Sequence, residues 1–231
     1  MSAVVLSHPV FCLMLTLLVF ACGQWLFERS GRHPLFNPVA FAILTLIALL
    51  VALDIPYSRY FADTQMIHLL LGPATVALAV PLHANLSRVR KALLPMLAAL
   101  LAGSVTAISV ALGVGWLMGL DLPALLSLAP KSATAPVAMG VSERIGGAPA
   151  LTAVMVLLTG VIGAIAVTPL MTVLRIRDWR ARGFAVGVAA HGIGTARAFQ
   201  VNETAGAFSG IGMGLNAILT AILAPLAASL F

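Results

Sequence analysis

Charged residues are scarce in this chain of 231 residues: Lys, Arg, Asp and Glu make up only 9% of it, whereas 61% of the residues are hydrophobic. This composition excludes an ordinary soluble globular domain, in which about a quarter of the residues are charged. An apolar helix needs about 20 residues to cross roughly 30 Å of hydrocarbon. Five apolar runs approach or exceed this length: Val10 to Phe27, Pro38 to Leu53, Ala92 to Leu120, Pro149 to Leu174 and Thr204 to Phe231.

Reactive and metal-binding groups are also scarce. The only cysteines, Cys12 and Cys22, lie in the first apolar run, and a bridge across one helix is geometrically excluded, so we expect both to be packing residues. The chain shows no nucleophile with its base, no phosphate-cradling glycine loop and no metal-ligand spacing. We therefore expect neither an enzyme nor a bound cofactor or metal. The first run has no preceding Lys or Arg and no A-x-A site after it, so we interpret it as a retained span.

Acidic residues are fewer than basic ones, 7 against 13, which gives a formal net charge of +6. The basic residues form short clusters between apolar runs and not one continuous face, so the sequence favours a role in membrane topology over nucleic-acid binding. On the positive-inside rule all three clusters are cytoplasmic. They consist of Arg29 and Arg32; Arg88, Arg90 and Lys91; and Arg175, Arg177, Arg180 and Arg182.

Three further hydrophobic segments are interrupted by proline, glycine or charge. They span Leu69 to Leu86, Leu126 to Ala150, and the stretch AAHGIGTARAF from Ala189 to Phe199. Proline removes a backbone donor and kinks or breaks a helix, and glycine loosens it. The sequence therefore predicts an all-α, polytopic membrane protein, a single transmembrane domain over 1–231 with about six to eight hydrophobic segments and two broken-helix or re-entrant elements.

Two of the interrupted segments resemble each other. Residues 130–143 align with residues 190–203 without gaps, which places Lys131 opposite His191 and Glu143 opposite Glu203. If the basic clusters are cytoplasmic, 122–148 must start and end outside, and 183–203 must enter from the cytoplasmic side. This predicts two oppositely inserted hairpins and an internal inverted repeat of 122–174 and 183–231, as in many secondary transporters. The alternatives are that the similarity is due to chance, or that either segment crosses the bilayer fully and places one basic cluster outside.

The interrupted segments are the candidate site, because non-helical backbone at membrane depth persists only where protein or a water-filled cavity satisfies it. Helix N-termini there favour anions. A charge in a membrane span is costly unless it is paired or lines a cavity, which singles out Lys131 and Arg197; the Arg197 fork matches a carboxylate. Of the remaining predicted substrate-binding residues, His191 provides a hydrogen bond from its ring, and the others provide hydroxyls or close approach to the backbone: Ser132, Thr134, Gly192, Gly194 and Thr195.

Each of these residues also has a structural interpretation. Arg197 would pair with Glu203 or Glu143, and Lys131 would extend its stem toward an interface. His191 titrates near neutrality and is a proton-relay candidate together with Glu143 and Glu203, but a membrane histidine is often just hydrogen-bonded to a neighbouring helix, and either glutamate can sit in water at a hairpin mouth. Glycines four residues apart, at 206, 210 and 214 and at 115 and 119, are typical of close helix packing.

Three ordered blocks carry a family resemblance. LLGPATVALAVPL (70–82), PKSATAPVAMGVSERIGG (130–147) and AAHGIGTARAFQ with GAFSGIGMGLN (189–216) resemble the signature blocks of the LrgB/CidB family of bacterial membrane proteins, and the resemblance runs from residue 10 to the C-terminus. It implies a multi-pass protein of the bacterial inner membrane. Arg144 stands where glutamine is common in related sequences.

The resemblance implies two kinds of function. Some members are described as antiholin-like regulators of murein hydrolase export and cell lysis that act with a small holin-like partner of the LrgA/CidA type. Others look like monocarboxylate carriers, since bacterial pairs import pyruvate and a plastid relative exchanges glycolate and glycerate. We expect a carrier of small monocarboxylates, with or without coupling to protons, and the alternatives are the lysis regulator and a purely structural partner subunit. The expected partners are a small carboxylate, an LrgA/CidA-type protein, the bilayer and further copies of the chain, but no nucleic acid.

Overall fold

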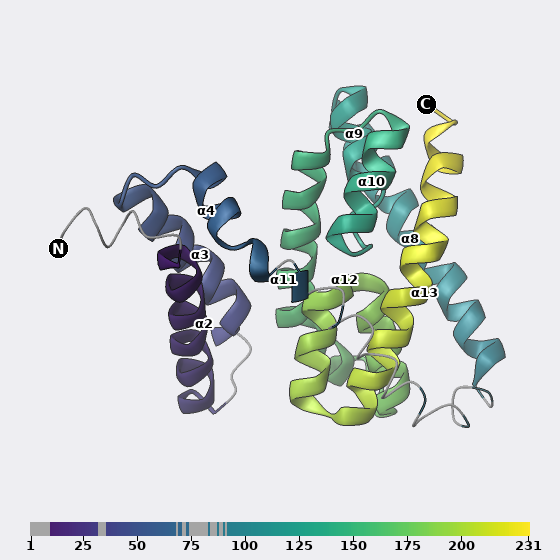
Figure 1. Ribbon diagram of the computed structural model, residues 1–231. Helices are drawn as coiled ribbons and strands as arrows, with labels where there is room; N and C mark the ends of the chain where they lie inside the picture. Colours follow the sequence, from purple (N-terminus) through teal and green to yellow (C-terminus); the bar gives the residue numbers. More distant parts are fainter. Residues whose placement is uncertain are drawn as a thin grey trace. The chain divides into compact units, whose positions relative to one another are not determined.

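The computed structural model describes residues 10–31, 36–67, 69–70, 73, 83, 87, 90 and 92–231, and in these ranges it contains helices and no strand (Figure 1). The chain divides into two compact units, Met1–Val80 and Pro81–Phe231, which are described separately. Most of the first interrupted segment, together with His68, lies outside the described residues.

The first unit contains α2 (Phe11–Arg29), α3 (Pro38–Ala52) and α4 (Tyr57–Asp63). Helices α2 and α3 pack through Val19, Ala42 and Leu46. Helix α3 begins at Pro38 because Asn37 caps it, accepting hydrogen bonds from the amides of residues 39 and 40 at 2.9 and 3.1 Å. Both cysteines are free thiols, Cys12 buried and Cys22 exposed.

Four helices in the described part of the chain are long and apolar enough to cross a membrane. One is α2; the others belong to the second unit and are α8 (Leu93–Leu117), α11 (Pro149–Val173) and α13 (Glu203–Ala228). All four agree within a few residues with the predicted apolar runs, and the fifth run forms the shorter α3. The helical membrane architecture is confirmed, whereas the predicted count of six to eight segments is not.

The first broken element of the second unit is a hairpin. Helix α9 (Leu122–Leu128) and helix α10 (Ala135–Ile145) are separated by a non-helical tip at 129–134. The hairpin ends close to where it began: the amide of Ala148 donates to Ser127 Oγ at 2.7 Å, and Thr152 Oγ1 donates to Ser142 Oγ at 2.7 Å. The element therefore enters and leaves at the end where α8 stops and α11 starts.

The second broken element lies within α12 (Trp179–Val201), which is interrupted at Ala190 and at His191, whose φ is 42° and ψ is −136°. The chain reverses there, because a Cβ on Gly194 would lie 2.8 Å from Cγ1 of Val186 in the first arm. The arms 179–189 and 192–201 thus form a hairpin inserted from the opposite end of the unit. Figure 1 shows α9 and α10 in its upper half and α12 in its lower half, beside α11 and α13.

Close backbone contact fixes the second hairpin on α13. A Cβ on Gly187 would collide with the carbonyl oxygen of Ser209, and a Cβ on Gly212 would lie 2.6 Å from the carbonyl oxygen of Phe184. The predicted glycine pattern is only partly a packing face, because Gly206 lies against Phe199 while a Cβ on Gly214 would meet nothing within 4 Å. In Figure 1 the hairpin therefore packs against the lower part of α13, which continues upward past it to the C-terminus.

Candidate functional site

Asn216 anchors the tip of the first hairpin. It lies in the middle of α13 with 1% of its surface exposed; its Nδ2 donates to the carbonyl oxygen of Ser132 at 3.0 Å, and its Oδ1 accepts from Ser104 Oγ at 2.7 Å. The Ser132 carbonyl is in non-helical backbone, so this amide supplies a hydrogen bond that a helix would otherwise provide. Asn216 therefore positions Lys131 and Ser132. The sequence signal was a lone amide in a lipid-compatible span.

The tip of the second hairpin is fixed to α11 and α13. His191 is 4% exposed, and its Nε2 lies 2.8 Å from the carbonyl oxygen of Val156. A carbonyl oxygen only accepts, so Nε2 donates, and in the neutral ring Nδ1 is the acceptor. Thr195 Oγ1 donates to the carbonyl oxygen of His191 at 2.8 Å and lies 2.9 Å from Ser209 Oγ. The hydrogen bond from His191 to the Val156 carbonyl of α11 is the bond to a neighbouring helix that the structural interpretation of His191 predicts.

The two tips meet the same part of α11. Ala133 of the first tip packs against Val156, whose carbonyl accepts the His191 hydrogen bond. Two helical segments begin at these tips, α10 at Ala135 and the second arm of α12 at residue 192. Their N-terminal amides add partial positive charge to the interior of the unit.

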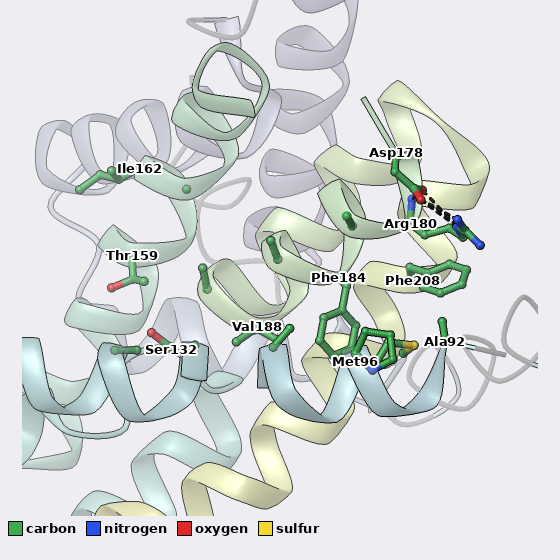
Figure 2. Close-up of a pocket in the computed structure, with 18 of the residues that line it drawn as sticks. Ala92, Met96, Ser132, Thr159, Ile162, Asp178, Arg180, Phe184, Val188 and Phe208 are labelled. Atoms are coloured by element: carbon green, nitrogen blue, oxygen red, sulfur yellow. Dashed lines mark hydrogen bonds and ion pairs between the residues drawn. The ribbon is translucent and has the colours of Figure 1, made fainter. Parts of the chain in front are cut away.

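A cavity of about 920 Å³ runs from the first tip to the end of the unit where α8 and α12 begin. Figure 2 shows Ser132 and Thr159 at its inner end and the Asp178–Arg180 pair at its mouth. The lining residues come from α8, the first tip, α11, α12 and α13. They are Ala92, Pro95, Met96, Ala99, Gly103, Ala107, Lys131, Ser132, Thr159, Ile162, Gly163, Asp178, Arg180, Ala181, Phe184, Ala185, Val188, Ala189 and Phe208.

The mouth carries a balanced ion pair between two exposed side chains. Arg180 donates to the Asp178 carboxylate at 2.6 Å, and this hydrogen bond holds the pKa of Asp178 below its usual value. Asp178 also caps α12 by accepting from the Arg180 amide at 2.8 Å. Ala92, which follows the second basic cluster, lines the same cavity as Arg180 of the third cluster. The beginnings of α8 and α12 thus lie at one end of the unit.

The inner end has three polar groups that face the cavity. Lys131 is half-buried, and within the described residues the ion pairs are Arg180 with Asp178 and Arg59 with Asp63, so no acidic side chain there neutralises Lys131. The hydroxyls of Ser132 and Thr159 form no hydrogen bond with another described residue. Thr159 was not predicted, because nothing marks it within a long apolar run.

The structure brings Lys131 and Ser132 together in the cavity wall but places the other predicted binding residues elsewhere. Arg197, 5% exposed, lines a much smaller pocket with Trp179 and Arg182 near the outer end of the second hairpin. Gly192 is exposed, whereas Gly194 and Thr195 are packed inside the hairpin. Thr134 precedes the first residue of α10, and Glu143 and Glu203 are exposed and form no ion pair within the described chain.

Comparison with known proteins covers nearly the entire chain. The family model of the LrgB-like family matches residues 16–230. The chain is 37% identical over 218 residues to YwbG of Bacillus subtilis (strain 168), which covers 94% of this chain and 96% of that protein. It is 29% identical over 218 residues to the antiholin-like protein LrgB of Bacillus cereus (strain B4264), covering 94% and 95%. No solved structure matches. Because the family match runs from within α2 to beyond the end of α13 and includes both hairpins, the chain belongs to the LrgB-like family.

Proposed function

We propose that this membrane protein carries small monocarboxylates, such as pyruvate, glycolate, glycerate or lactate, across the bacterial inner membrane. The observation that carries the proposal is Lys131, a cation at the inner end of a large cavity with no acidic partner among the described residues. A charge at membrane depth is costly unless it is paired or hydrated, and such charges mark substrate pathways. A carboxylate ligand supplies the missing partner.

The inner end suits a small acid with a second polar group. The Lys131 ammonium donates to the carboxylate, and the hydroxyls of Ser132 and Thr159 act as donors or acceptors for the neighbouring hydroxyl or keto oxygen. The N-terminus of α10 adds positive potential on the same side. Asn216 holds the tip so that Lys131 and Ser132 face the cavity.

The hairpins provide a route for alternating access. The cavity opens at the end where α8 and α12 begin, while hydrogen bonds among Ser127, Ser142 and Thr152 close the base of the first hairpin at the other end. Movement of one hairpin relative to the long helices would close the cavity at this end and open it at the other, as in inverted-repeat transporters. The internal repeat of 122–174 and 183–231 and proton coupling through His191, Glu143 or Glu203 stay predictions. So do association with an LrgA/CidA-type protein and assembly into a homo-oligomer.

A second candidate function is regulation of cell lysis. It is favoured by the antiholin-like name of the Bacillus cereus relative, which is 29% identical to this chain. Control of a holin-like partner does not require a cation and two hydroxyls that face a cavity without a partner among the described residues, so the site supports the carrier better. The two functions are compatible, since transport of a central metabolite can influence lysis indirectly.

Uptake by purified protein in proteoliposomes, with and without an LrgA/CidA-type partner, tests the proposal. We expect saturable uptake of labelled pyruvate or glycolate that unlabelled monocarboxylates compete, and no release of an enclosed fluorescent dye. Dye leakage without saturable uptake would instead support a hole-forming assembly. Absence of uptake in both preparations would contradict the carrier.

A further inference from the structure

The middle of the cavity is apolar, unlike its two ends. Between the inner end and the mouth the wall is formed by Met96 of α8, Phe184 and Val188 of α12 and Phe208 of α13 (Figure 2). These side chains belong to one hydrophobic cluster and present part of their surface to the cavity. A small acid held at the inner end leaves this wall uncovered.

The cavity is also large for a three-carbon acid. Its volume of about 920 Å³ lies in the range of pockets that hold drug-sized ligands, about 300–1,000 Å³. Small residues, among them Ala99 and Gly103, keep the α8 side of the wall open. The space next to Lys131 therefore accommodates a substantial group attached to the carboxylate.

We propose that the cavity contains an apolar subsite for the tail of larger monocarboxylates, and that aryl 2-oxo acids such as phenylpyruvate bind there. The proposal rests on the proposed function, because the carboxylate is held by the same Lys131. The tail extends toward the mouth along the wall that Phe184 and Val188 form, and against the thioether of Met96.

Burial of a methylene-sized apolar group strengthens binding about fourfold, from ~0.8 kcal/mol per group. A phenyl ring covered on one face by this wall gains the equivalent of about two such groups. We therefore expect phenylpyruvate to bind about tenfold more tightly than pyruvate. The ratio of the two dissociation constants is the quantity to measure, by titration calorimetry on the full chain in lipid nanodiscs.

Two variants locate the subsite. Met96→Ala removes a wall contact, and Ala99→Asn places a polar group on the cavity face of the same helix without removing a core side chain. Both should reduce the tenfold ratio to about threefold or less. The matched controls are Leu97→Ala and Ala98→Asn, exposed neighbours that do not line the cavity, and both should keep the wild-type ratio.

The outcomes separate the subsite from the carrier proposal. If pyruvate binds but phenylpyruvate binds no more tightly, or if Ala99→Asn leaves the ratio at tenfold, the subsite is overturned while the carrier proposal stands. If neither acid binds the wild type, both are overturned. Lys131→Met should weaken binding of both acids by a similar factor of about ten or more, and phenylpyruvate binding that this change leaves unaltered would overturn the shared carboxylate position.

Discussion

Replacing Lys131 by methionine tests whether this cation serves a ligand or the fold. Methionine keeps the unbranched apolar stem and removes the ammonium, which has no acidic partner among the described residues. Removing one partner of a buried ion pair is strongly destabilising, whereas removing a charge without a protein partner is neutral or stabilising. Lys131→Met should therefore fold, with a melting temperature in detergent equal to or above that of the wild type.

The effect on the ligand should be large. A hydrogen bond to a charged group contributes about 1.5–3 kcal/mol. With about 1.4 kcal/mol for each factor of ten, the dissociation constant for pyruvate should rise about 10- to 150-fold. Because the cavity is water-accessible at its mouth, through the exposed Asp178 and Arg180, part of the lost attraction is replaced by solvent and the lower half of this range is expected.

Calorimetric binding and initial uptake rates provide the assay. The control is Arg144→Gln, which neutralises an exposed cation near the base of the same hairpin and should change pyruvate binding less than twofold. The reasoning is refuted if Lys131→Met binds pyruvate as the wild type does. It is also refuted if the variant loses its fold, since that would make Lys131 a structural residue.

Three other perturbations test the supporting geometry. Asn216→Ala leaves the Ser132 carbonyl without its donor, so unfolding should become easier by about 1–3 kcal/mol and pyruvate binding should weaken; unchanged thermal stability and affinity would contradict the anchor. Gly187→Ala forces the second hairpin off α13 and should destabilise by about 1–3 kcal/mol, whereas Gly214→Ala, in open space, should not, as detergent melting can show. If His191 relays protons, His191→Gln keeps a donor for the Val156 carbonyl but should abolish uptake driven by a proton gradient; an unchanged gradient dependence excludes the relay.

The helices and hairpins were predictable because the membrane imposes strong rules on the sequence. Apolar runs of sufficient length gave the boundaries of α8 and α11 within a few residues, since few charges interrupt them. Pro130, Pro136 and the glycines of 187–194 marked where helices break, because these residues weaken the helical hydrogen-bond ladder. The basic clusters then predicted which helix ends face the same side of the membrane.

Whether Arg197 and Lys131 lie at the same site could not be judged from sequence, because the position of Arg197 depends on where the second hairpin reverses. The reversal occurs at His191, a non-glycine residue at positive φ. Arg197 follows by six residues, so it lies about 9 Å down the returning arm, at ~1.5 Å per residue. A reversal a few residues later would have placed it near the tip.

Thr159 was missed for a different reason. Its residue type is common in membrane helices, and only the face of α11 that meets the first tip distinguishes it. Val156, Thr159 and Gly163 are spaced by three and four residues and share that face. Because α11 is almost uniformly apolar, its periodicity does not show which face contacts the first tip; only the tertiary structure does.

Cysteine accessibility at the inner end tests the central claim most directly. In a background with both native cysteines replaced by serine, Ser132→Cys places a thiol in the cavity wall beside Lys131. A small membrane-impermeant thiol reagent should label it from the side that carries Asp178 and Arg180, and pyruvate should slow labelling by about threefold or more. Labelling only from the opposite side, or labelling that pyruvate leaves unchanged, would contradict a carboxylate site at the inner end of this cavity.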